Sequence, residues 1–288
     1  MFSRMEPLSN EEIQQAVKLA LAEDIGSGDV TTLATVPENT LANAEMRARE
    51  PLTVAGLALA EAAFRQLSDA VQLTRLMEDG QRATSGRVLL KISGPARALL
   101  SAERVALNFV QRLSGVATLT AQFVEAIKGT NAAILDTRKT TPGLRRFEKY
   151  AVTCGGGQNY RLGLFDMVLI KDNHLAALKN ASPNAIAAAV KGARAKYPNL
   201  KVEVEADTLE QVEQAVGVGA DFVLLDNMSL EQLRAAVAKC RGHVKTEASG
   251  GVNLTTVRAI AETGVDFISV GALTHSARAV DIGLDFED

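Results

Sequence analysis

The sequence predicts an α/β protein in which most strands are parallel and covered by helices. Beyond about residue 130, short apolar runs alternate with stretches whose apolar residues recur at helical spacing. Two of these units, VGVGADFVLLDN and AETGVDFISVGA, resemble each other, and both join a helix end to a strand through a glycine. Repeated units of this kind imply parallel strands, because parallel strands need long crossovers. The period alone is compatible with an open doubly wound sheet and with a (β/α) barrel.

Strands and helices in the second half of the chain follow from this pattern. The expected strands are AAILDT, DMVLIKDN, KVEVEA, DFVLLDN, HVKTEAS and FISVGA. The expected helices include NAIAAAVKGARAKY, TLEQVEQAV, SLEQLRAAVAK and LTTVRAIAETG. Thr208 with Gln211, and Ser229 with Gln232, have capping-box spacing and mark two helix starts. No GxGxxG motif follows a first strand, which leaves a dinucleotide site without support.

The first part of the chain shows a different sequence pattern. A helix is expected from about Ser9 to Glu23, with Ser9 and Glu12 at capping-box spacing. Across residues 41–99, short alternating segments separated by Gly, Pro and Asp predict antiparallel strands. One helix, at about Leu57–Leu67, interrupts them.

A long helical pattern then runs from about Ser101 to Lys128 and is expected to break near Ser114-Gly115. We take this break as the domain boundary. The prediction is an N-terminal domain at residues 1–114 and a catalytic domain at residues 115–274.

Composition excludes several classes of protein. A length of 288 residues with 47% hydrophobic and 23% charged residues fits a folded globular protein. A net charge of −3 gives no reason to expect a nucleic-acid partner. Cys154 and Cys240 lack metal-ligand spacing, and Cys154 has no histidine nearby that would mark a nucleophile. No signal peptide and no membrane-spanning run are expected, so the prediction is a soluble cytoplasmic protein.

Polar and charged residues follow each expected strand of the second half. They are Asp136-Thr137-Arg138-Lys139, Lys171-Asp172-Asn173-His174, Glu205, Asp226-Asn227, Glu247 with Ser249-Gly250-Gly251, and Gly271. The C-terminal ends of parallel strands meet at one edge, where barrels and open α/β sheets place their active sites. The sequence therefore predicts one site built from all these strand ends.

The charges on that edge are sorted. Residues 138–171 contain seven Lys or Arg and two acids, whereas residues 202–231 contain eight acids and no Lys or Arg. Such a division suits a polyanionic substrate handled with a divalent metal, because cations bind the anions and carboxylates hold Mg²⁺ or ribose hydroxyls. The SGG and VGA segments offer backbone N–H groups for a phosphate ahead of helix N-termini.

Structural explanations compete for some of these residues. Arg145, Arg146 and Lys149 fit a solvated helix face. His174 and His275 fit hydrogen-bonded structural histidines. Asp226-Asn227 could end a strand and cap a helix. Glu205 is favoured as functional because Glu203 and Glu205 give a buried strand a polar face, which is costly unless it is used.

Together the motifs resemble a known family, the quinolinate phosphoribosyltransferases. The resembling motifs are ERVALNFVQRLSGVAT, LDTRKTTPGLR, CGGGQNYRLGLFD, LIKDNH, VEVEAD, LLDN, EASGGV, VGALTHS and DIGLD. They cover the chain from about residue 100 to its end in family order, and LTVAG near residue 52 also fits. The resemblance implies a type II phosphoribosyltransferase fold: an N-terminal α/β sandwich and an incomplete (β/α) barrel, with the tail 275–288 returning to the first domain.

The resemblance also implies a reaction and an assembly. Quinolinate and phosphoribosyl pyrophosphate would give nicotinate mononucleotide, CO₂ and pyrophosphate, a step of de novo NAD biosynthesis. Family members are Mg²⁺-dependent homodimers or larger assemblies whose site is completed by the neighbouring subunit.

Residue roles carry over by motif position. The residues implied to bind quinolinate are Arg104 from the partner subunit, Thr137, Arg138, Lys139, Tyr160 and Arg161. Those implied to bind the phosphoribosyl donor are Lys171, Asn173, His174, Ser249, Gly250, Gly251 and Gly271. Lys139, Lys171, Glu205 and Asp226 are the implied catalytic residues, and the last two would bind Mg²⁺, directly or indirectly.

One position departs from the family pattern. The family commonly has Asn-His-Arg where this chain has Asn159-Tyr160-Arg161. Tyrosine can donate a hydrogen bond to a carboxylate but carries no positive charge near neutral pH. We expect Tyr160 to act through its hydroxyl.

Two other readings remain. One keeps the phosphoribosyl donor and takes nicotinate or another aromatic acid as acceptor, although three arginines exceed what one carboxylate needs. The other is a non-catalytic protein that binds a phosphorylated or dicarboxylate ligand, which would not need the acids Glu205 and Asp226.

Overall fold

The computed structural model describes residues 7–287, which form two compact units. The N-terminal unit contains residues 7–121, Thr141–Gly156 and residues 276–287. The barrel unit contains Gln122–Thr140 and Gly157–His275. The chain passes between the two units after Ala121, Thr140, Gly156 and His275.

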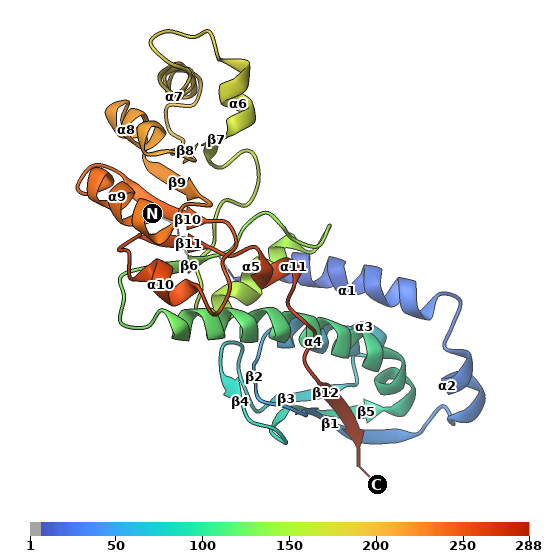
Figure 1. The fold of residues 1–288 in the computed structure, drawn as a ribbon. Coiled ribbons are helices and arrows are strands. Elements are labelled where there is room, and N and C mark those ends of the chain that lie inside the picture. The colour runs from blue at the N-terminus through green and yellow to red at the C-terminus, as the bar shows by residue number, and fades with distance from the viewer. Residues whose placement is uncertain (1–6, 288) are drawn as a thin grey trace. The chain divides into compact units, whose positions relative to one another are not determined.

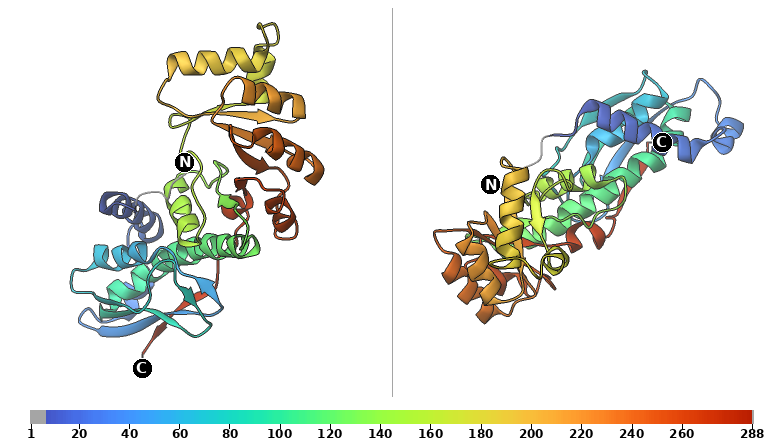
Figure 2. Two further views of the ribbon diagram at one scale, coloured as in Figure 1. Left: turned by 90° about the vertical axis from the view of Figure 1, so that its left-hand side faces the viewer. Right: turned by 90° about the horizontal axis from the view of Figure 1, so that it is seen from above.

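The N-terminal unit combines an antiparallel sheet with helices (Figure 1). Its helices are α1 (Asn10–Ile25), α2 (Val30–Thr35), α3 (Leu57–Leu67), most of α4 (Ala96–Ala126) and α5 (Arg145–Cys154). Its strands are β1 (Leu41–Ala48), β2 (Leu52–Thr53), β3 (Gln72–Arg75), β4 (Arg82–Ala83), β5 (Val88–Pro95) and β12 (Ile282–Phe286). The main sheet has the order β12-β1-β5-β3, so the C-terminal strand pairs with the first (Figure 2). The expected cap of α1 is confirmed, because Ser9 and Glu12 form a capping box.

The helix α4 runs without interruption through Ser114 and Gly115, so the predicted break is wrong. Both residues instead serve close packing. The Ser114 hydroxyl exchanges hydrogen bonds with the backbone of Ala55. A Cβ atom on Gly115 would lie 2.0 Å from the carbonyl oxygen of Arg278. The glycine is therefore explained by the approach of the C-terminal tail and not by a helix end.

We expect Gly115→Ala to destabilise the protein by about 1–3 kcal/mol, since a new methyl group must displace packed backbone. Urea unfolding followed by circular dichroism measures this free energy. An unchanged midpoint and slope would contradict the tight approach at Gly115.

An ion pair holds the tail within the same unit. The Arg278 guanidinium donates to both carboxylate oxygens of Glu50, which also accepts the backbone N–H of Asp281. The Arg278 hydrogen bond, followed by that of Asp281, lowers the pKa of Glu50 from 4.5 to about 2.

The stabilisation by Glu50 should be complete above pH 4.5 and lost as the pH falls towards 2, because protonation removes the acceptor charge. For this exposed pair the contribution is small, about 0.5–1 kcal/mol. Glu50→Gln should therefore lower stability at pH 7 and converge with the unmutated protein near pH 2. Equal stabilities at pH 7 would contradict the contribution of the pair.

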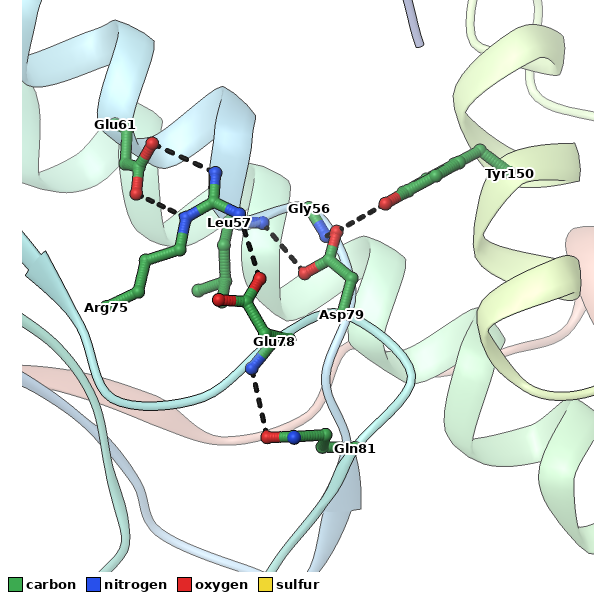
Figure 3. A network of polar contacts seen from close by, with 8 residues as sticks. All are labelled: Gly56, Leu57, Glu61, Arg75, Glu78, Asp79, Gln81 and Tyr150. Atoms are coloured by element: carbon green, nitrogen blue, oxygen red, sulfur yellow. Dashed lines mark hydrogen bonds and ion pairs between the residues drawn. The ribbon is translucent and has the colours of Figure 1, made fainter. Parts of the chain in front are cut away.

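The segment Thr141–Gly156 is anchored in the N-terminal unit by polar contacts of α5. Glu148 accepts hydrogen bonds from Arg112 and from the backbone and hydroxyl of Thr141. The Tyr150 hydroxyl donates to Asp79 at 2.8 Å, and Asp79 also accepts the backbone N–H groups of Gly56 and Leu57 at the start of α3 (Figure 3).

The barrel unit is a parallel sheet of six strands with the order β6-β11-β10-β9-β8-β7 (Figure 1). The strands are β6 (Ala133–Leu135), β7 (Val168–Ile170), β8 (Val202–Ala206), β9 (Phe222–Asp226), β10 (Lys245–Ser249) and β11 (Phe267–Ser269). The helices are α6 (Asp172–Ala177), α7 (Ala185–Lys196), α8 (Leu209–Gly217), α9 (Leu230–Cys240), α10 (Val257–Ala261) and α11 (Ala272–His275). All six expected strands are present, and both predicted capping boxes of α8 and α9 form.

The strand order decides between the two predicted architectures. From β7 to β11 each strand pairs with the next in sequence, without the reversal of a doubly wound sheet. The strands β6 and β7 lie at the two ends of the order, and Gln158 forms a bridge to Leu135 of β6 instead. This is a (β/α) barrel left open between its first two strands, and the predicted fold class is confirmed.

The repeated Asp-Phe motif has a structural explanation. Asp221, just before β9, accepts the backbone N–H of Val202 at the start of β8. Asp266, just before β11, accepts the backbone N–H of Thr246 in β10. Each aspartate ties the start of its own strand to the neighbouring strand.

Within residues 7–287, no helix is both long and apolar enough to cross a membrane.

Candidate active site

A cavity of about 680 Å³ lies in the barrel unit at the C-terminal ends of the strands. Its lining includes Thr137, Arg138, Lys139, Tyr160, Arg161, Lys171, Glu205, Asp226, Asn227, Glu247, Ser249, Gly250, Gly251, Ser269, Gly271 and His275. Each of the six strands contributes a lining residue at its C-terminal end or within two residues of that end. The predicted convergence of the strand ends on one site is therefore observed.

The loop after β6 is held in place by its own polar residues. Asp136 is fully buried and accepts hydrogen bonds from the Asn159 side chain at 2.6 Å and the Tyr160 backbone at 2.8 Å. The Thr137 hydroxyl oxygen accepts the Lys139 backbone N–H. The Thr274 hydroxyl donates to the Lys139 carbonyl. These hydrogen bonds fix the backbone of the loop. Arg138 and Lys139 therefore lose less conformational entropy when they line the cavity.

Arg161 is 9% exposed and lies in the cavity wall. One terminal nitrogen donates to the Met167 carbonyl at 3.0 Å, and the guanidinium carbon lies 5.8 Å from the centre of the Tyr160 ring. Its Nε has no hydrogen-bond partner among the described residues. A buried guanidinium with an unused donor is costly alone, so the site is suited to an anionic group.

Acidic side chains also line the cavity. Glu205, on β8, accepts a hydrogen bond from the Lys171 ammonium at 2.6 Å. Asp226 ends β9 and accepts a hydrogen bond from the Asn227 side chain at 2.7 Å. Asn227 has a φ of 53°, an unusual conformation for a residue other than glycine. No group of three or more His, Cys, Asp or Glu side chains placed to hold a metal ion occurs among residues 7–287.

The loop after β10 brings backbone close to Asn227. Gly250 has a φ of 97°, and a Cβ atom there would lie 2.1 Å from the side-chain oxygen of Asn227. The predicted helix N-terminus does not directly follow this loop, because α10 begins only at Val257. The intervening turn is formed by Asn253, whose side chain accepts the backbone N–H groups of Thr255 and Thr256.

Two glutamates of the barrel unit are buried, and one of them, Glu247, lines the cavity. Glu203 is fully buried on β8, and Glu247 is 1% exposed on β10. The Tyr160 hydroxyl donates to Glu203 at 2.6 Å, and the Ser269 hydroxyl donates to Glu247. Burial is the main cause that raises the pKa of both carboxyls. Burial, together with the charge of Glu203, also raises the pKa of Tyr160, so the phenol keeps its proton.

Three predicted site residues do not line the cavity. His174 accepts the backbone N–H of Lys171 through Nδ1 at 2.9 Å and so caps α6, which fits the structural alternative. Asn173 lies beside it on the same short helix. Arg104 is exposed on α4 in the N-terminal unit.

Other expectations require correction. Lys149 is fully buried and Arg146 pairs with Glu12, so these residues do not form a solvated face. Tyr160 directs its hydroxyl to the buried side chain of Glu203. The sequence did not predict that Glu203 accepts a hydrogen bond from Tyr160. The alternation of Glu203 and Glu205 with valines on one strand could have indicated that both glutamates face the same side. His275 lines the cavity, which the sequence left open.

Comparison with known proteins is consistent with this geometry. Residues 116–285 match the family model of the quinolinate phosphoribosyl transferase C-terminal domain, and residues 29–114 match that of its N-terminal domain. The chain is 44% identical over 278 residues to a nicotinate-nucleotide pyrophosphorylase (carboxylating) of Mycobacterium leprae, covering 94% of this chain and 96% of the relative. A probable enzyme of that name from Bacillus subtilis is 40% identical, covering 96% of this chain and 94% of its own length.

A solved structure agrees in fold along the whole chain. The nicotinate-nucleotide pyrophosphorylase of Francisella tularensis superposes with a TM-score of 0.93 at 40% identity, covering 100% of both chains. The two family models together span most of the chain, and the relatives match it along nearly their full length. These matches identify the family of the chain. The chain belongs to the quinolinate phosphoribosyltransferase family.

Proposed function

We propose that the protein transfers a phosphoribosyl group from phosphoribosyl pyrophosphate to quinolinate and releases CO₂ and pyrophosphate, giving nicotinate mononucleotide for NAD biosynthesis. The observation that carries this proposal is the cavity itself. Four cationic side chains, Arg138, Lys139, Arg161 and Lys171, line it together with the acids Glu205 and Asp226 and a glycine-rich loop. Membership of the family supplies the reaction to which this arrangement corresponds.

The acceptor is proposed to bind on the cationic side. Quinolinate carries two carboxylates on adjacent ring carbons, and Arg138, Lys139 and Arg161 offer enough donors for both. The unused Nε of Arg161 lets its guanidinium bind one carboxylate with more than one nitrogen. Nicotinate carries only one carboxylate and would leave part of this charge without a partner.

The donor is proposed to bind along Lys171, Glu205, Asp226 and the loops at Ser249–Gly251 and Gly271. The carboxylates suit ribose hydroxyls, and the glycine backbone suits a phosphate. Mg²⁺ fits this site, because the ion is commonly held by one or two carboxylates together with substrate phosphates. When bound, it would neutralise charge on the departing pyrophosphate, and Glu205 and Asp226 would hold it directly or through water.

The chemistry follows from placement of charge. Lys139 and Lys171 balance the negative charge that grows on pyrophosphate as the bond from ribose C1 to oxygen breaks. The pyridine nitrogen donates its electron pair to C1, which leaves the nitrogen positively charged. The C–C bond to the adjacent carboxylate then breaks, its electron pair stays on the ring carbon beside that charge, and a proton replaces CO₂. The protein orients both substrates and needs no covalent nucleophile.

Assembly and location are further parts of the proposal. We propose a homodimer, or a larger assembly, in which Arg104 of one subunit reaches the acceptor of the next. The exposure of Arg104 on α4 is compatible with this role. Mixing Arg104→Ala with Arg138→Ala subunits tests it, since activity returns only if Arg104 acts across an interface. Cytoplasmic location is proposed because Cys154 and Cys240 are both present as thiols.

A turnover assay tests the reaction. The purified protein is supplied with phosphoribosyl pyrophosphate, Mg²⁺ and either quinolinate or nicotinate, and nicotinate mononucleotide is quantified. We expect product from quinolinate and none from nicotinate. Product from nicotinate alone would establish the other acceptor, and tight quinolinate binding without product would indicate a binding protein.

A further inference from the structure

Four buried polar side chains of the barrel unit form a connected group, and three of them line the cavity. Tyr160 follows the bridge at β6, Glu203 lies on β8, Glu247 on β10 and Ser269 on β11. Each is less than one-tenth exposed. They lie beside the packed core of this barrel, which consists of Leu135, Tyr160, Met167, Leu169, Phe222, Leu224 and Phe267. Polar groups in such a core are costly unless they are hydrogen-bonded to one another.

The hydrogen bonds run in a fixed direction. Tyr160 donates to one oxygen of Glu203, and Ser269 donates to one oxygen of Glu247. The remaining oxygens, Oε1 of Glu203 and Oε2 of Glu247, have no other hydrogen-bond partner among the described residues. The two carboxyls are close enough to perturb each other's pKa, and one proton shared between them would satisfy both oxygens. The group then joins β11 to Tyr160 through Glu247 and Glu203.

Tyr160 links this group to the cavity wall. Its ring lies 5.8 Å from the guanidinium carbon of the next residue, Arg161, within the range of a cation–π contact. Arg161 also donates a hydrogen bond to the Met167 carbonyl. Tyr160 and Arg161 both line the cavity. The Tyr160 ring therefore helps to place Arg161, and the hydroxyl of that ring is fixed by its hydrogen bond to Glu203.

We propose that Glu203 is a positioning residue for the acceptor: it fixes Tyr160 and, through the tyrosine ring, holds the Arg161 guanidinium in place for a carboxylate, with Glu247 and Ser269 completing its hydrogen bonds. This inference rests on the proposed function, since it assigns Arg161 to the acceptor. Glu203 itself does not line the cavity, so it acts through Tyr160 and not on the substrate.

Hydrogen-bonding capacity, and not the charge of Glu203, is what the role requires. Glutamine at this position keeps an oxygen that accepts from Tyr160 and adds an amide that donates to Glu247. Leucine removes both. Tyr160→Phe removes the hydroxyl while leaving the ring in the core, so it separates the hydrogen bond from the packing.

The test compares these variants by their Michaelis constants for the two substrates. Glu203→Leu and Tyr160→Phe should each raise the KM for quinolinate about tenfold. Each variant removes the hydrogen bond between Tyr160 and Glu203, which helps to hold Arg161 in position for a substrate carboxylate. The KM for phosphoribosyl pyrophosphate should stay within about twofold, because neither variant alters a side chain that is proposed to bind the donor. Glu203→Gln should return the KM for quinolinate to near that of the unmutated protein.

A matched control separates positioning from general loss of stability. Thr246 is also buried and neighbours Glu247 on β10, but it faces the opposite side of the strand and donates to Asp266. Thr246→Val should lower the melting temperature and leave both Michaelis constants unchanged.

An unchanged KM for quinolinate in Tyr160→Phe or Glu203→Leu, or an equal rise for both substrates, would overturn the positioning role. So would a Glu203→Gln variant that behaves like Glu203→Leu. If Glu203→Leu does not fold, Tyr160→Phe still decides. Failure of the unmutated protein to turn over quinolinate would instead overturn the proposed function.

Discussion

Arg161→Ala is expected to reduce kcat/KM for quinolinate roughly 100- to 1,000-fold, the range for removing one partner of a buried charge pair. The guanidinium is 9% exposed, is held by the Met167 carbonyl and the Tyr160 ring, and has an unused Nε donor. Alanine at this position leaves no donor for an acceptor carboxylate. Steady-state kinetics with quinolinate varied at saturating phosphoribosyl pyrophosphate measure the loss.

Two further variants sharpen this result. Arg161→Lys should recover only part of the activity, because an ammonium group replaces a planar fork by a point charge. Arg234→Ala removes an exposed arginine of α9 in the same unit and should leave kcat/KM within about twofold. A loss in Arg161→Ala no greater than in Arg234→Ala would remove Arg161 from the acceptor site.

Gly250→Ala is the second substitution with a large expected effect. The residue has a φ of 97°, and an added Cβ would lie 2.1 Å from the Asn227 side-chain oxygen and 2.9 Å from its backbone nitrogen. The loop must move, and Asn227 and the adjacent Asp226 with it. A displacement of about 1 Å in such a site can cost about 100-fold in rate, so we expect a loss of that order in kcat/KM for phosphoribosyl pyrophosphate.

The control for this variant is another glycine of the barrel unit. Gly192 lies within α7, and a Cβ atom there would meet nothing within 4 Å. Gly192→Ala should keep full activity and slightly raise the stability, since alanine favours the helix. Donor kinetics in Gly250→Ala that match those of Gly192→Ala would show that this loop does not shape the donor site.

The barrel was predictable from the sequence because its signals are local. Each strand is a short apolar run with polar residues at its end, so Arg138, Lys171, Glu205 and Asp226 could be placed at one edge without knowing the strand order. The choice between open sheet and barrel needed that order, which depends on pairing between segments far apart in sequence. Periodicity carries no such information.

Residues that depend on tertiary contacts could not be assigned correctly. A glycine that breaks a helix and one that admits another backbone look alike in sequence, and Gly115 is of the second kind. Lys149 has the composition of a solvated position and is fully buried. The hydrogen bond of Tyr160 joins it to Glu203, 43 residues away, so the direction of the hydroxyl followed only from the structure.

The most direct test of the central claim follows the carboxylate that leaves. Quinolinate labelled with ¹³C in the carboxylate next to the ring nitrogen is incubated with the protein, phosphoribosyl pyrophosphate and Mg²⁺, and labelled CO₂ and pyrophosphate are both quantified. The account predicts one labelled CO₂ for each pyrophosphate, and neither product when the phosphoribosyl donor is omitted. Pyrophosphate without labelled CO₂, or labelled CO₂ without the donor, would contradict it.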